Sequence, residues 1–246
     1  MIAFSLALTL AVAGVGPGPG PAPKTGEEVI RAMYEKYNKT WYRQLSFVQR
    51  AIFPGKPEEE WWEALKIPGR LRIDVAPIDS GVRSVIYRGD SLYVFAQKKL
   101  ANKAVQPNLL LVLGFDVYGQ PAESTIAVLK RGQFDLTKVH EETWDGRPAY
   151  VVGAAQGDLE SNQFWIDKER LVFLRLIDKG PNGSSDIRFT KYEQLGGGWI
   201  GTEVHFFRGG KEFFTEIYRD WKINPAVTED LFDVGEWKRP AWVPKK

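Results

Sequence analysis

The 246-residue chain contains no cysteine. Disulfide bonds, thiol nucleophiles, zinc sites with cysteine ligands and lipid attachment at a cysteine are therefore excluded. Histidine is nearly as scarce, since His140 and His205 are the only two. They do not have the four-residue spacing of a helical metal-binding pair. We therefore expect the protein to use no metal and no cofactor.

An excess of charge of one sign is also missing. The formal net charge is only +2 at pH 7, and no run of lysine and arginine stands out. Proteins that bind nucleic acids usually carry a basic stripe or patch, so we expect no nucleic-acid partner. The glycine run of residues 196–198 does not connect a strand to a helix in a βαβ unit, which excludes a dinucleotide-binding loop.

Signatures of enzymes are absent or weak. The chain has no G-x-S-x-G nucleophile motif. Paired carboxylates and tryptophans could instead flank and stack on a sugar, as in a β-sandwich hydrolase: Glu141 with Glu142, Asp158 with Glu160, and Glu203 with Glu216, beside Trp165, Trp199 and Trp221. Acidic residues that alternate with apolar ones on strands more often form a solvent-exposed face. We therefore predict that the chain is not an enzyme, with a carbohydrate-active β-sandwich as the alternative.

The N-terminal residues 1–14, MIAFSLALTLAVAG, are uncharged and almost wholly apolar. This run is shorter than the roughly 20 residues that a membrane-spanning helix needs, and the small residues before Gly14 suit a cleavage site. We predict an export signal over residues 1–14, followed by a Gly/Pro-rich tether over 15–24. An apolar N-terminal strand is the alternative. Without a cysteine to acylate, the exported protein is expected to be soluble and not lipid-anchored.

Residues 25–37, TGEEVIRAMYEKY, carry the clearest helix pattern. Thr25 and Glu28 match a capping box. Val29, Met33 and Tyr37 fall on one apolar stripe, which must pack against another part of the molecule.

Most of the remaining chain has the pattern of strands. In residues 70–75 the apolar side chains of Leu71, Ile73 and Val75 alternate with charged ones. Turn signals recur every eight to twelve residues or so, which is typical of an antiparallel meander. The Leu-rich residues 108–136 predict two short helices, and residues 57–66 fit either a helix or an edge strand. We therefore predict a mainly β chain in which one long, curved antiparallel sheet of about ten strands is covered by an N-terminal helix and a mid-chain helical pair.

Several phrases in this order resemble the LolA-like proteins, the outer-membrane lipoprotein-sorting carriers. They are PGRLRID, Pro77, VIYRGDSLYVF, GRPAYVV, NQFWIDKERLVFLRL and INPAVTEDLFDV. The likeness extends over residues 26–234, and we predict one domain over residues 25–236 with a C-terminal tail over 237–246. One position differs, because Ile67 stands where the best-known carriers have an arginine directly before the proline, with Lys66 one residue earlier.

The resemblance implies a half-open β-barrel with a helical lid over a hydrophobic cavity, in a periplasmic protein that carries lipoprotein acyl chains or a lipid without a covalent bond. Inner- and outer-membrane transport proteins are the further partners it implies, and a monomer is expected. The alternative within the same fold is a regulatory module that senses a lipid or a peptide. We predict that the following side chains line the cavity or face it from the lid: Leu71, Ile73, Phe95, Leu110, Leu111, Leu113, Phe164, Ile166, Leu174, Val204, Phe206, Phe214 and Trp221.

Overall fold

The computed structural model describes residues 22–180 and 183–244, so the predicted export signal and most of the tether lie outside it. The strands form one antiparallel sheet of 13 strands in the order β6-β5-β4-β3-β2-β1-β13-β12-β11-β10-β9-β8-β7. Its two edge strands, β6 and β7, do not pair with each other within this order, so the sheet stays open. The predicted half-open, mainly β fold is confirmed, with more strands than the sequence suggested.

Consecutive strands pair with each other except for β6 and β7, and β13 pairs in addition with β1. Sequence could not decide between a helix and an edge strand for residues 57–66, and they form β2 inside the sheet. The strands are β1 (Gln44–Ile52), β2 (Glu59–Lys66), β3 (Arg70–Val75), β4 (Arg83–Arg88), β5 (Ser91–Ala96), β6 (Lys99–Val105), β7 (Val139–Trp144), β8 (Arg147–Val152), β9 (Gln163–Asp167), β10 (Phe173–Gly180), β11 (Gly183–Leu195), β12 (Gly198–Arg208) and β13 (Lys211–Ile223).

Helix α1 (Gly26–Tyr37) forms as predicted. The Thr25 hydroxyl accepts a hydrogen bond from the Glu28 amide at 3.2 Å. The Glu28 carboxylate accepts from the Lys24 amide at 2.6 Å, one residue before the amide that a capping box would use. The predicted apolar stripe of α1 is buried, and Val29 and Met33 have no exposed surface.

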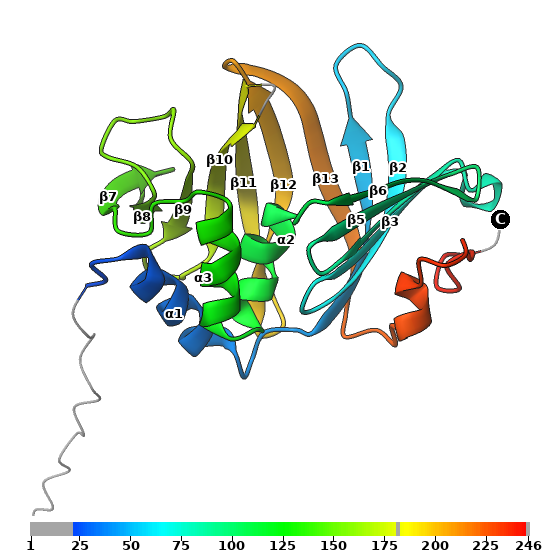
Figure 1. Cartoon of the computed structure of the whole chain (residues 1–246), viewed down its shortest axis with the longest axis horizontal. Helices are drawn as coiled ribbons and strands as arrows, with labels where there is room; N and C mark the ends of the chain where they lie inside the picture. The colour runs from blue at the N-terminus through cyan, green and yellow to red at the C-terminus, as the bar shows by residue number, and fades with distance from the viewer. Residues whose placement is uncertain (1–21, 181–182, 245–246) are drawn as a thin grey trace, which may run out of the picture.

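The mid-chain segment forms the two expected short helices, α2 (Leu109–Gly114) and α3 (Ala122–Arg131), joined through a 3₁₀ turn, η2 (Asp116–Tyr118). Figure 1 shows α1, α2 and α3 together on one side of the sheet, in front of the strands that follow β7. Buried side chains of these helices share one large apolar core with strands β8–β12. We call the sheet face that carries this core the inner face.

The C-terminal segment covers part of the opposite, outer face. Its 3₁₀ turn, η3 (Glu229–Phe232), lies beside β3 and β4, and Figure 1 shows this orange-to-red segment on the side away from the helices. Ile86, Phe95 and Phe232 form a second, smaller core there with Val227. The Trp237 indole donates to the Ser84 hydroxyl at 2.8 Å, so packing continues past residue 236, where the sequence placed the end of the domain.

Candidate functional site

A small cavity lies on the inner face between helix α2 and the sheet. The Asn108 side chain caps α2 by accepting hydrogen bonds from the amides of Leu110 and Leu111, both at 3.0 Å. The cap fixes the start of α2, whose Leu110 and Leu111 side chains lie against the sheet. The cavity has a volume of about 70 Å³ and is lined by Phe47, Gln49, Glu63, Leu65, Leu71, Ile73, Asn108, Leu110, Leu111, Phe115, Phe189, Glu216 and Tyr218. We call this space the inner cavity.

Most of its wall is apolar, but one side is not. Gln49, Glu63, Glu216 and Tyr218 come from β1, β2 and β13, and we call these four residues the polar cluster. Gln49 is paired across the strands with Tyr218, and Glu63 with Phe47 on the same strand as Gln49. The exposed fractions of Gln49, Glu63 and Glu216 are 1%, 4% and 8%.

The polar cluster is only partly satisfied by hydrogen bonds. The Tyr218 hydroxyl donates to the Glu216 carboxylate. In contrast, Gln49 Nε2 and Glu63 Oε1 have no hydrogen-bond partner among the described residues. Burial raises the pKa of the Glu63 carboxyl well above its usual range, and the nearby Glu216 raises it further. Burial also raises the pKa of Glu216, although the hydrogen bond from Tyr218 and the neighbouring Gln49 side chain oppose this shift.

Four of the predicted ligand-binding residues meet at the inner cavity: Leu71 and Ile73 from β3, and Leu110 and Leu111 from α2. Others belong to the same apolar core without lining this cavity, namely Leu113, Phe164, Ile166, Leu174, Val204, Phe206 and Trp221. Of these, Leu174 lines the larger pocket described below. Phe206, on β12, and Trp221, on β13, are only partly buried.

The other two predicted residues, Phe214 and Phe95, do not line the inner cavity either. Phe214 nevertheless lies on the inner face, where it pairs with Phe206 and contacts its ring; it also stacks on Phe53 with ring centroids 4.5 Å apart. Phe95 lies on the outer face, in the small core beneath the C-terminal segment. The expectation that Phe95 shares a surface with Leu71 is therefore wrong, because Phe95 pairs across the strands with Ser84 on the outer face.

Sequence reasoning missed the polar cluster. The sequence pattern groups Glu216 with Glu203 as a pair that could flank one sugar, and both fit the pattern of a solvent-exposed strand face. In the structure Glu216 is paired with Val204, so Glu203, one residue before Val204, points to the opposite face. The two carboxylates are therefore on different sides of the sheet. The burial of Glu63 and Gln49 has no signal in the sequence. Both are polar residues within strands, where polar side chains are usually exposed to solvent.

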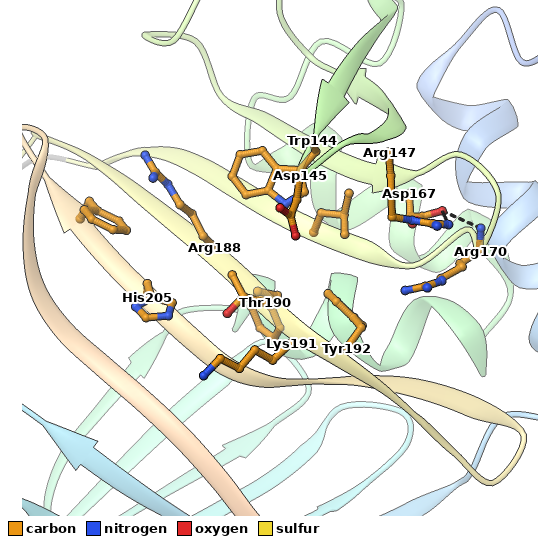
Figure 2. Close-up of a pocket in the computed structure, with 13 residues that line it drawn as sticks. Trp144, Asp145, Arg147, Asp167, Arg170, Arg188, Thr190, Lys191, Tyr192 and His205 are labelled. Carbon is orange, nitrogen blue, oxygen red and sulfur yellow. Dashed lines mark hydrogen bonds and ion pairs between the residues drawn. The ribbon is translucent and has the colours of Figure 1, made fainter.

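A larger pocket of about 580 Å³ lies on the outer face of β10–β12. Figure 2 shows its labelled side chains, including Arg188 and His205, which are directly paired on β11 and β12. The adjacent pair, Phe189 and Val204, belongs to the inner core, so Arg188 and His205 project the other way. The pocket is lined by Trp144, Asp145, Arg147, Asp167, Arg170, Leu174, Arg188, Phe189, Thr190, Lys191, Tyr192, His205 and Phe207.

The basic groups of this outer pocket are mostly neutralised by nearby carboxylates. The Arg147 guanidinium contacts Asp167 at 2.7 Å, Arg188 contacts Asp186 at 2.7 Å, and Lys191 contacts Glu203 at 2.6 Å. Burial would raise the pKa of Asp167, but hydrogen bonds from Arg147 and from the Arg170 amide lower it overall. Ion pairs of this kind leave little net field for an anionic ligand, so the inner cavity is the better candidate site.

The described residues hold no group of three or more acidic or histidine side chains that could bind a metal ion. Likewise, none of the helices described is long and apolar enough to cross a membrane. His205 is held by the Glu212 carboxylate, 2.7 Å from its Nδ1.

No protein-family model matches the sequence, and no curated protein matches it. Solved structures do match the fold. A DUF1329 family protein from Desulfovibrio piger superposes with a TM-score of 0.55 at 16% identity, covering 85% of this chain and 95% of that one. A domain described as an outer membrane lipoprotein-sorting protein, from Vibrio parahaemolyticus, gives 0.57 at 11% identity over 85% and 96% of the two chains. A LolA superfamily protein from Nitrosomonas europaea gives 0.50 at 15% identity over 83% and 97%.

The chain has a LolA-like fold. The resemblance drawn from short sequence phrases is thereby confirmed at the level of the fold, over most of the chain. Within this LolA-like fold, Ile67, the residue that replaces an arginine of the best-known carriers, is buried in the inner core at 7% exposure. It is therefore a packing residue here.

Proposed function

We propose that this protein is a periplasmic lipid carrier that holds acyl chains of lipoproteins, or a lipid, non-covalently on its inner face. The observation that carries the proposal is the inner cavity, where apolar side chains of β3 and of α2 meet. The LolA-like fold supports it. Membrane transport proteins would be its donor and acceptor partners.

The inner face continues beyond the cavity as a partly exposed apolar surface. The strand register places Ile73 beside Val85, and Val85 beside Val94. All three side chains are half-buried, and Tyr87 on β4 is partly buried against the inner core. An acyl chain on this surface would be removed from water at a gain of about 0.8 kcal/mol per CH₂ group.

Loading requires movement of α2. An apolar cavity of roughly 150 Å³ holds one benzene ring, so a space of about 70 Å³ does not accept an acyl chain as it stands. Displacement of Leu110 and Leu111 would join the cavity to the apolar surface of β3–β5. We propose that α2 acts as the lid: it closes on the sheet when the site is empty and moves away when an acyl chain enters.

The test is mass spectrometry of lipid extracted from the purified protein, followed by binding of a palmitoyl ligand to variants. Ile73→Trp fills the cavity and should weaken binding at least about tenfold. Val82→Trp is the matched control, because Val82 is 44% exposed outside the cavity, and it should bind normally. The absence of any extracted acyl species together with no palmitoyl binding would refute the proposal.

A further inference from the structure

The polar cluster is an anomaly in an otherwise apolar wall. A buried donor or acceptor without a partner costs about 1–3 kcal/mol, and native proteins keep few such groups. Here one unpaired donor, Gln49 Nε2, and one unpaired acceptor, Glu63 Oε1, are buried in residues that line the same cavity. A ligand that supplied the missing partners would remove both costs on binding.

We infer that the polar cluster binds the polar group of the ligand, and that this group is uncharged and both donates and accepts hydrogen bonds, as a hydroxyl or an amide does. The inference rests on the proposed function, because it names the class of lipid that the inner cavity prefers. A group with a donor alone would leave the Gln49 amide nitrogen unpaired, and a group with an acceptor alone would leave the carbonyl oxygen of the neutral Glu63 carboxyl unpaired.

The charges around the cavity argue against an anionic head group. Its lining residues include two carboxyl side chains, Glu63 and Glu216, and no lysine, arginine or histidine. A fatty-acid carboxylate or a phosphate would therefore enter without a counter-charge, at a high desolvation cost. The raised pKa values of both glutamates also favour their neutral, protonated forms, which suits a neutral ligand.

The position of the cluster is set by the sheet. Gln49 is directly opposite Tyr218, whose hydroxyl is already committed to Glu216. The apolar side chains of Leu71, Ile73 and Leu110 line the same space. A ligand with its polar group at the cluster would thus extend its hydrocarbon chain over β3 and under α2, and groups on strands hold such geometry more firmly than loops do.

The experiment compares two ligands of equal chain length, 1-monopalmitoylglycerol and palmitate, by displacement of a fluorescent apolar dye from the full chain. The wild type should prefer the monoacylglycerol by at least about tenfold, the value of one unpaired buried group. Gln49→Leu and Glu63→Leu should each reduce this preference severalfold and still bind the dye. Glu63→Gln retains a donor and an acceptor and should keep the preference, as should Glu203→Gln on the outer face.

The outcomes separate this inference from the proposed function. Equal binding of both ligands, unchanged in Gln49→Leu and Glu63→Leu, would overturn the inference and leave the carrier proposal standing. Tighter binding of palmitate would do the same. Failure of both ligands and of the dye to bind would overturn both. Circular dichroism checks that each variant is folded. If Glu63→Leu does not fold, the comparison of Gln49→Leu with the wild type is sufficient for the test.

Discussion

Arg72 and Asp74 form an ion pair on the outer face whose side chains are each only 2% exposed. The Arg72 guanidinium contacts the Asp74 carboxylate at 2.7 and 3.0 Å and also donates to the Leu231 and Lys238 carbonyls. The Ser84 hydroxyl donates to Asp74. One arginine therefore joins β3 to the C-terminal segment.

We predict that Arg72→Met lowers the free energy of unfolding by about 3–5 kcal/mol, because it leaves the Asp74 carboxylate buried without its counter-charge. The double variant Arg72→Met with Asp74→Leu should recover part of this loss. Urea unfolding measures both effects. Trypsin should also cleave after Lys238 faster in both variants, since both lose the bond to its carbonyl; cleavage at the wild-type rate would contradict the anchoring role.

Individual residues also show where sequence reasoning reached its limit. Leu71 and Ile73 could be assigned to the inner face because charged residues alternate with them. In SLYVFA both faces of β5 are apolar, so the pattern could not say on which side Phe95 lies, and a shift of one residue reverses every side chain. Glu63 was equally hidden, since its burial depends on α2, which comes from a distant part of the chain.

At the scale of elements, α2 is held by few local interactions. It has six residues, and isolated helices of that length are not stable in water. Its N-terminal amides depend on the Asn108 cap, while Leu111 and Leu113 anchor it to the inner core. This combination suits a segment that must leave the sheet and return.

We predict that Asn108→Ala destabilises α2 by about 1 kcal/mol. Hydrogen exchange of the amides of residues 110–114 should become faster, and the apolar dye should enter the inner cavity more quickly. Thr25→Ala is the matched control, because it removes the corresponding cap of α1 and should leave dye entry unchanged. Equal acceleration in both variants would indicate general loosening of the fold instead of a lid movement.

Elements were predictable where their signals are local. The cap and the apolar stripe of α1 are encoded by residues of the helix and its N-cap. The turns of the β hairpins are likewise encoded by the few residues that form them. In β2 the side chains of Trp61 and Trp62 lie on opposite faces, so no single apolar face separated strand from helix. The position of β2 between β1 and β3 is fixed by pairing with residues of those two strands. The residues of β2 alone therefore do not determine it.

At the scale of the whole molecule, most of the strand order follows from the sequence order, because consecutive strands pair as hairpins; the pairing of β1 with β13 and the separation of β6 from β7 do not follow from it. The volume of the inner cavity could not be predicted from the sequence, because it depends on how Leu110, Leu111 and Phe115 fill the space above β3. Packing of this kind is settled by side chains from many elements at once.

Stability of the whole molecule should depend on pH through its buried carboxyl groups. Asp116, in the turn η2 between α2 and α3, accepts hydrogen bonds from the Gly69 amide at 3.0 and 3.1 Å. Its exposed fraction is 3%. Burial raises the pKa of Asp116 to about 7, although the bond from Gly69 lowers it somewhat. Glu63 and Glu216 are shifted in the same direction.

A carboxyl group whose pKa is higher in the folded state binds more protons there than in the unfolded chain. Its contribution to stability is therefore complete below the unfolded pKa, near 4, and is lost as the pH rises to about 7. For Asp116 the free energy of unfolding should fall by roughly 3 kcal/mol between pH 5 and pH 8. Asp116→Asn keeps an acceptor for the Gly69 amide and cannot ionise, so urea unfolding should show a smaller decline. Asp145→Asn, at the exposed β7–β8 turn, should decline like the wild type, and an Asp116→Asn curve parallel to it would show that Asp116 is not the group responsible.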